Sequence, residues 1–341
     1  MKWRSILIGV LISAFFLYLA FRQTDLHEVW AHLTAARYGY LVPASLLTLL
    51  AFWVRAVRWG WLLRSLKPIP DLTLYSATMI GFMCNNILPM RLGEFVRAYV
   101  IGRSAGIRPS AAFATIVVER LFDLFSMIGI FGLILAFFPL HSRMFKIGVL
   151  AAFLIGLGVL VLLLVFHLRG AIFRAWAGRL LPVLIRDRTL RILESFETGL
   201  GIFRDGRRIL VVGLLTLLMW LCFVFVIQLC FAAARLETAG GDLPPLASLV
   251  VMVVMAIGIM VPSGPGFVGT LQAAAVLGLA IVGYRDQGRA LSFSILYHIT
   301  QWFPVVIVGF FFLMKEQLSL SQVGRISGKG YLDANAAEPP E

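Results

Sequence analysis

Charged residues are scarce in this chain: Asp, Glu, Lys and Arg make up 14% of its 341 residues, well below the share of about 25% in soluble domains. The hydrophobic set reaches 60%, which excludes a soluble globular protein. The few charges are mostly positive, and the formal net charge is +13. In a soluble chain such a surplus would indicate nucleic acid, but beside this apolar fraction it indicates anionic lipid. We expect no nucleic-acid partner.

Cysteine and catalytic motifs are also scarce. Cys84, Cys222 and Cys230 all lie in apolar runs and match no metal or disulfide spacing. The chain has no Ser-His-Asp order, no H-E-x-x-H and no P-loop. Gly264 to Gly269 match G-x-G-x-x-G, but an apolar helical run precedes them where a dinucleotide-binding fold needs a strand. We therefore expect no metal, no cofactor and no enzyme activity.

Apolar runs recur along almost the whole length. A helix needs about 20 such residues to cross a hydrocarbon core of roughly 30 Å. The first run lacks a small-residue cleavage site after Phe21, which is typical of a retained anchor. The runs predict an all-α polytopic membrane protein with about six full transmembrane helices, at residues 5–21, 39–61, 111–138, 145–167, 209–233 and 289–314.

Two further apolar regions, 72–104 and 246–283, are interrupted by proline, glycine and polar residues. Both predict broken helices or re-entrant hairpins, because backbone groups freed at membrane depth must be satisfied by protein or by water in a cavity. The residues expected to break the helices or act as gates are Pro89, Gly93, Pro262, Gly264, Pro265, Gly266 and Gly269.

Lys and Arg favour one threading of these hairpins, since short cytoplasmic loops are enriched in them. If each hairpin enters and leaves on one side, 22 basic residues lie inside and 7 outside, with both termini cytoplasmic. The two hairpins then enter from opposite sides. This predicts an inverted repeat in a plasma-membrane protein, as in many secondary transporters. Two unrelated kinked regions are the alternative.

Two segments lie outside the predicted spans. Residues 169–208 carry nine arginines, with apolar residues at helical spacing, which predicts amphipathic helices on the inner leaflet. Residues 318–341 are small and polar and predict a disordered cytoplasmic tail. The membrane domain is therefore expected to cover residues 1–317.

Charges inside predicted membrane segments are the first candidate site. They are costly at membrane depth and so indicate function by default. Glu119, Arg120 and Asp123 share one face of the third span, and Arg91, Glu94 and Arg97 share one side of the preceding arm. A purely structural ion-pair network with zero net charge is the alternative, and the two interpretations are compatible.

Polar residues around the second break are the other candidates. A helix that restarts after a break presents unpaired N–H groups that can hold an anion, although a structural kink explains the pattern equally well. His298 and Gln301 lie three apart on the last span, where a hydrogen-bonded packing role competes with proton transfer. The full set of candidate headgroup-binding or transport residues is Asn85, Asn86, Arg91, Glu94, Arg97, Glu119, Arg120, Asp123, Ser263, Gln272, His298 and Gln301.

The motif from Asn86 to Glu94 (N-x-x-P-x-R-x-G-E), the motif from Glu119 to Asp123 (E-R-x-x-D) and the turn from Pro262 to Gly266 resemble a known family. It is the flippase-like transmembrane domain of lysylphosphatidylglycerol synthases and their stand-alone relatives, and the resemblance covers most of residues 1–315. It implies movement of a charged phospholipid between leaflets. Relatives have a carboxylate near the position of Gln272, so chemistry at the second break can differ here.

The synthases add a soluble lysine-transferring domain, and this sequence ends after the membrane part, so we expect no lysyl transfer. Stand-alone members accompany envelope-lipid, isoprenoid or glycosyltransferase pathways. The sequence thus predicts a transporter for an anionic or aminoacylated phospholipid or a polyprenyl-linked lipid. Its expected partners are membrane lipids, with a lipid-modifying enzyme or glycosyltransferase as a further candidate. A non-transporting accessory protein and a membrane-embedded transferase are the alternatives.

Overall fold

The computed structural model describes residues 2–21, 25–88, 92–137, 143–180, 183–200, 205–236, 243–244, 246–261 and 263–320. The described residues form helices and connecting turns and contain no strand, so the protein is an all-α membrane protein as predicted. The α-helices are α1 (Lys2–Phe21), α2 (Leu26–Thr34), α3 (Leu41–Leu63), α4 (Asp71–Ile87), α5 (Gly93–Ala105), α6 (Pro109–Phe137), α7 (Arg143–Leu180), α8 (Val183–Gly199), α9 (Gly206–Ala233), α10 (Ala247–Met260), α11 (Thr270–Ile281) and α12 (Gln287–Lys315).

Helix boundaries follow local chemistry as well as hydrophobicity. The side chains of Asp25, Asp205 and Asp286 accept hydrogen bonds from the first backbone N–H groups of α2, α9 and α12. Such N-caps satisfy donors that have no partner within the helix. At the other end of a helix, α5 stops at Gly106, whose φ of 66° suits glycine.

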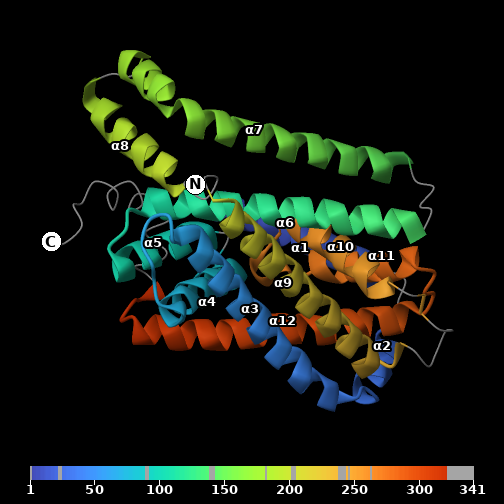
Figure 1. Cartoon of the computed structure of the whole chain (residues 1–341). Coiled ribbons are helices and arrows are strands. Elements are labelled where there is room, and N and C mark those ends of the chain that lie inside the picture. Colours follow the sequence, from blue (N-terminus) through green and yellow to red (C-terminus); the bar gives the residue numbers. More distant parts are fainter. Residues whose placement is uncertain are drawn as a thin grey trace.

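In Figure 1, α6, α7 and α12 run from one end of the molecule to the other, and six helices of the described chain have 20 residues or more. These helices, α1, α3, α6, α7, α9 and α12, coincide with the six predicted spans. By length and composition, four segments in the described part of the chain can cross a membrane: Tyr38–Leu63, Phe153–Arg179, Gly206–Ala233 and Gln287–Lys315. The 29-residue α6 is about 43 Å long at 1.5 Å per residue.

The two interrupted regions are helical hairpins. In the first, α4 packs against α5, and in the second, α10 packs against α11. The first hairpin follows α3 and precedes α6 at one end of the molecule, and the second follows α9 and precedes α12 at the opposite end (Figure 1). The predicted breaks are therefore present, although Pro89, Arg91 and Pro262 lie outside the described residues.

The break of the second hairpin reaches the break of the first. Between α10 and α11 the chain forms the short 3₁₀ turn η5 (Pro265–Phe267), which packs against α4. Gly266 has a φ of 73°, and a Cβ added there would lie 3.6 Å from the carbonyl oxygen of Asn86 and 3.1 Å from Nε1 of Trp302. Only glycine allows this backbone conformation at so close an approach without strain.

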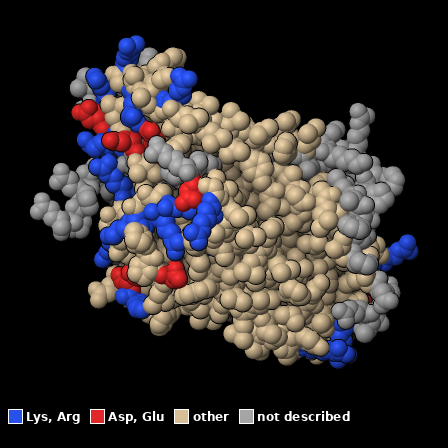
Figure 2. All heavy atoms as spheres, viewed as in Figure 1, with Lys and Arg blue, Asp and Glu red and all other residues tan. Residues whose placement is uncertain are grey.

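The base of the first hairpin is held by the last helix. Glu316, directly after α12, accepts hydrogen bonds from Ser76 of α4 at 2.8 Å and from Ser104 of α5 at 3.3 Å. We call this end of the molecule the basic end, because Lys and Arg side chains gather there over α5 and α8 (Figure 2). The rest of the face in Figure 2 is largely uncharged, as expected for a surface that contacts lipid.

The segment 169–208, predicted as amphipathic helices, is helical over most of its described length, and its position on the inner leaflet stays a prediction. Residues 169–180 continue α7, and α8 packs against α6 and α7. Phe196 meets Phe166 of α7 with ring centroids 5.8 Å apart, and Leu200 is completely buried. The apolar face that the sequence shows is therefore covered by protein, because α6 and α7 offer apolar partners to it. Phe203 and the predicted tail from residue 321 onward lie outside the described residues.

The tight crossing of α4 and α5 yields a prediction about folding. A Cβ added at Gly93 would collide with the carbonyl oxygen of Gly81 and lie 2.6 Å from Asn85. We expect Gly93→Ala to lower the free energy of unfolding in detergent by about 1–3 kcal/mol, the usual cost of overpacking.

Gly129→Ala, in the exposed middle of α6 with nothing within 4 Å, is the matched control and should be neutral or stabilising. Equal unfolding midpoints for the two variants would contradict the close crossing.

Candidate functional site

Five charged side chains from three helices form a buried cluster. They are Arg55 and Arg58 of α3, Arg97 of α5, and Glu119 and Asp123 of α6, and each residue is at most 8% exposed. Arg58 Nη1 lies 2.6 Å from Asp123 Oδ1. Arg97 Nη1 lies 3.0 Å from Glu119 Oε2. We call these five residues the charge cluster.

The helical spacing of these residues explains how they meet. Arg55 and Arg58 are three apart on α3, while Glu119 and Asp123 are four apart on α6, so each pair faces the other helix. Arg55 Nη1 lies 3.1 Å from Glu119 and 3.2 Å from Asp123, and so bridges both carboxylates. Arg58 also contacts both, with Nη2 3.0 Å from Glu119 Oε1. The charge cluster therefore binds α3 to α6 through crossed ion pairs.

Neutral groups complete the surroundings of the arginines. Arg58 Nη1 donates a hydrogen bond of 2.8 Å to Thr216 of α9. The guanidinium of Arg97 lies 3.8 Å from the ring centroid of Trp59, whose own Nε1 donates to Thr115 of α6 at 2.9 Å. Cation–π stacking of this kind stabilises a desolvated cation.

One edge of the charge cluster is open. The side chain of Arg120 is 39% exposed; its Nη1 lies 3.2 Å from Asp123, and its Nη2 lies 3.8 Å from Glu94 of α5. Asn85, at the end of α4, donates to Glu94 at 3.4 Å and accepts from the N–H of Gly93 at 2.7 Å. The charge cluster is thus connected through Arg120 and Glu94 to the first helix break.

The charges at this site do not balance. Among the described residues, three buried arginines face two buried carboxylates, and Arg120 with Glu94 adds one charge of each sign. The result is a surplus of one positive charge. The neutral network that the sequence offers as an alternative includes Arg91, which lies outside the described residues, and does not include Arg55 or Arg58, so its charge balance stays a prediction.

A second polar group surrounds the break between α10 and α11. Gln272 accepts a hydrogen bond from the N–H of Gly269 at 2.7 Å, and its Nε2 lies 2.9 Å from Nδ1 of His298. His298 also bonds to the backbone of Gly266. One glutamine and one histidine thus hold both glycines of the break that have positive φ.

The remaining candidates of the second half take different places. Ser263 lies 3.2 Å from the hydroxyl of Thr270, and the N–H of Gly264 donates to Ser13 of α1 at 2.8 Å. Gln301 does not join His298, although the two share a helix face; its Nε2 donates to Thr48 of α3 at 2.8 Å. Gln301 therefore connects α12 to α3.

Two arginines of the charge cluster were missed by sequence reasoning. Arg55 and Arg58 are not among the candidate residues predicted from the sequence, although the predicted span 39–61 contains both. An arginine pair spaced three apart within an apolar run is the signal that could have identified them. What the sequence did not show is that α3 faces α6.

Within the part of the chain that the structure describes, no group of three or more His, Cys, Asp or Glu side chains is placed to hold a metal ion. The chemistry that the site offers is binding of an anion by guanidinium groups, at a partly exposed edge beside a helix break.

Comparison with known proteins places this arrangement in context. The family described as "Lysylphosphatidylglycerol synthase TM region" matches residues 6–309. A protein of Haloferax volcanii named "Glycosyltransferase AglD" is 24% identical over 93% of this chain and 55% of its own length. The chain thus spans about half the length of that relative.

A second relative is nearer in size. A protein of Methanothermobacter thermautotrophicus named "UPF0104 membrane protein" is 26% identical over 75% of this chain and 78% of its own length. No solved structure matches the chain.

The charge cluster predicts a strong effect of a near-isosteric change. Asp123→Asn keeps the shape of the side chain but removes the carboxylate that Arg55, Arg58 and Arg120 share. We expect the free energy of unfolding to fall by about 3–5 kcal/mol, the usual cost of removing one partner from a buried ion pair.

Arg208→Gln is the control, because it removes an ion pair with Asp205 whose side chains are 30% and 40% exposed. Its effect should stay within about 1 kcal/mol. The free energy of unfolding of both variants is measured in detergent, with circular dichroism as the signal for unfolding. Similar losses for the two variants would show that the charge cluster does not hold α3 against α6.

Proposed function

Because this chain belongs to the lysylphosphatidylglycerol synthase transmembrane family, we propose that it moves a lipid with an anionic headgroup between membrane leaflets. The substrate is an anionic or aminoacylated phospholipid or a polyprenyl-linked lipid. Arg120, with Arg97 behind it, attracts the negative headgroup, and Glu94 meets any cationic group on it. The protein acts in the plasma membrane with both termini cytoplasmic, as the bias of Lys and Arg favours, and performs no catalytic step.

The observation that carries this proposal is the positive surplus of the charge cluster among the described residues, and helix length favours a position within the membrane for it. From Asp123 to the end of α6, 14 residues give about 21 Å of helix, less than the roughly 30 Å of a hydrocarbon core. An unbalanced positive charge is costly at such a depth. A bound anionic headgroup at the Arg120 edge would neutralise it.

The arrangement of the two hairpins supports transport. They enter from opposite ends, and their breaks meet at Asn86 and Gly266, which is the arrangement expected of an inverted repeat with the substrate site at the facing breaks. Opening one break at a time would expose the Arg120 edge to one leaflet and then to the other. Acyl chains would remain in the bilayer beside the apolar surface.

An accessory role is the second candidate, favoured by the name of the Haloferax volcanii relative, which is a glycosyltransferase. In this role the protein would bind the lipid for a lipid-modifying enzyme or a glycosyltransferase without moving it. The same charge cluster would bind the headgroup, but exchange between leaflets would be absent.

Transport is tested in proteoliposomes with fluorescent lipids of anionic, aminoacylated, polyprenyl-phosphate and zwitterionic type. We expect protein-dependent exchange of at least one charged lipid above the rate for phosphatidylcholine. Arg120→Gln should slow that exchange by about tenfold or more, since a charge-assisted hydrogen bond contributes roughly 1.5–3 kcal/mol. Stability should change less than in Asp123→Asn, because the pairs of Arg55 and Arg58 with Asp123 remain.

Arg207→Gln, an exposed arginine at the start of α9, is the control and should transport normally. Lipid retention without exchange would support the accessory role and contradict transport. If Arg120→Gln transports as fast as the unmodified protein, the headgroup does not pass this edge.

The meeting of the two breaks has its own test. Gly266→Ala forces a Cβ into a positive-φ position against Trp302 and Asn86, whereas Gly283→Ala creates the same kind of strain with nothing within 4 Å. We expect Gly266→Ala to reduce the exchange rate several-fold and Gly283→Ala to leave it near normal. Binding of lipid, measured by co-purification, should persist in both. Equal exchange rates in the two variants would argue against a gate at Gly266.

A further inference from the structure

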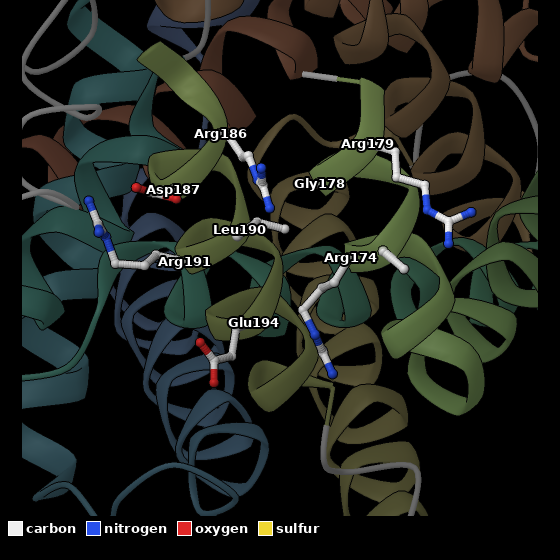
Figure 3. Close-up of a pocket in the computed structure, with 9 residues that line it drawn as sticks. Arg174, Gly178, Arg179, Arg186, Asp187, Leu190, Arg191 and Glu194 are labelled. Carbon is white, nitrogen blue, oxygen red and sulfur yellow. The ribbon is translucent and has the colours of Figure 1, made fainter. Parts of the chain in front are cut away.

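A separate basic hollow lies at the basic end, between the last turns of α7 and the first half of α8 (Figure 3). Its volume is about 740 Å³, within the size range of small-molecule sites. The residues of the charge cluster do not line it. Those that do include four arginines and two carboxylates: Arg174, Arg179, Arg186, Arg191, Asp187 and Glu194. We call it the α7–α8 groove.

Local geometry holds the two walls of the groove at a defined separation. The helical φ and ψ of α7 are interrupted at Arg169, and the next residue, Gly170, packs against the carboxylate of Glu197 on α8. Any Cβ at Gly170 would collide with that carboxylate. Glu197 in turn pairs with Arg174. A kink, a close approach and an ion pair therefore fix the base of the groove.

The groove carries a positive surplus. Four arginines line it against two carboxylates, and Glu197 pairs with one of these arginines, Arg174, so that one positive charge is left over. Arg186 reaches from α8 toward Gly178 of α7, and a Cβ added at Gly178 would lie 3.7 Å from Nε of Arg186 (Figure 3). Arginine forks match the geometry of phosphate oxygens and bind them through two parallel hydrogen bonds. The charge and the size of the groove both suit a phosphate-containing headgroup.

Exposed apolar side chains also lie on α7, the helix that forms one wall of the groove. Leu168, Ile172 and Trp176 are 76%, 48% and 66% exposed, and they lie in the segment Phe153–Arg179 that can cross a membrane. A tryptophan and arginines at the end of such a segment are typical of the interface between hydrocarbon and headgroups. A ligand in the groove is thus positioned to extend acyl chains beside α7.

We propose that the α7–α8 groove binds the phosphate headgroup of an anionic membrane lipid, whose acyl chains lie against the exposed face of α7. This site is distinct from the charge cluster. The proposal depends on the membrane position of α7 and does not require that the protein transports lipid. The sequence predicts only that residues 169–208 are attracted to the inner leaflet, whereas this proposal assigns a specific lipid headgroup to residues 169–194.

The test uses the full-length protein in nanodiscs of phosphatidylcholine, titrated with fluorescent phosphatidylglycerol. All variants, and the parent protein with which they are compared, carry Arg120→Gln, so that binding of phosphatidylglycerol beside the charge cluster adds as little as possible to the measured binding. The double variant Arg179→Gln/Arg186→Gln should bind about tenfold more weakly than its parent, since each guanidinium–phosphate contact removed is charge-assisted. The double variant Arg103→Gln/Arg207→Gln, which removes two exposed arginines of the same end, should bind like the parent.

A variant that keeps every charge separates the groove from general electrostatics. Gly178→Leu fills the space beside Arg186 and should also weaken binding several-fold. Thermal unfolding of each variant shows whether the fold is intact, and a variant that unfolds is replaced by Arg179→Lys/Arg186→Lys, for which intermediate binding is expected because the forked donors are lost.

Three results would overturn the proposal. They are equal losses in the two double variants, binding of fluorescent phosphatidylcholine as tight as that of phosphatidylglycerol, and unchanged binding in Gly178→Leu. If soluble glycerol 3-phosphate competes as strongly as the lipid, the ligand is a free phosphate ester and the lipid assignment is wrong. If the unmodified protein binds phosphatidylglycerol in the groove but exchanges no lipid between leaflets, the proposed transport function is wrong and the groove proposal stands.

Discussion

Burial of three arginines against two carboxylates is the constraint on which the rest of the molecule depends. Arg55, Arg58 and Arg97 cannot stay in an apolar interior without Glu119 and Asp123. Their pairing places α3, α5 and α6 side by side at one depth. Since α5 is the second arm of the first hairpin, the ion pair between Arg97 and Glu119 also fixes the position of that arm against α6.

The position of the first break in turn determines what surrounds the second. Asn85 binds the start of α5, and the carbonyl oxygen of its neighbour Asn86 lies against Gly266. Gln272 and His298 then hold the glycines of the second break. A continuous series of polar contacts and close packing therefore connects the charge cluster with the opposite hairpin.

The structure uses arginine in two physically different settings. In the charge cluster, guanidinium groups are desolvated and their geometry is fixed by carboxylates, Thr216 and Trp59. In the α7–α8 groove, arginines line a hollow open to the surface, supported by the pair of Arg174 and Glu197. The first setting suits selection of a charged headgroup at membrane depth, and the second suits binding of a headgroup at the membrane surface.

The sequence by itself determined the class of the protein, the six long helices and the two breaks. These properties depend on local features: the length of apolar runs, and proline or glycine within them. It also identified Glu119, Arg120 and Asp123, because charges in an apolar run are visible without any knowledge of neighbours. Gln301 was grouped with His298 for the same local reason, since spacing on one helix gives no information about the helix opposite.

Only the tertiary structure decided which elements face one another. It brought Arg55 and Arg58 into the charge cluster, directed Gln301 toward Thr48, and packed the apolar face of α8 on α6 and α7. Each of these outcomes depends on contacts between residues far apart in the chain, such as Arg58 and Thr216. Helical periodicity places residues on a face, but the partner of that face is chosen by the packing of the whole molecule.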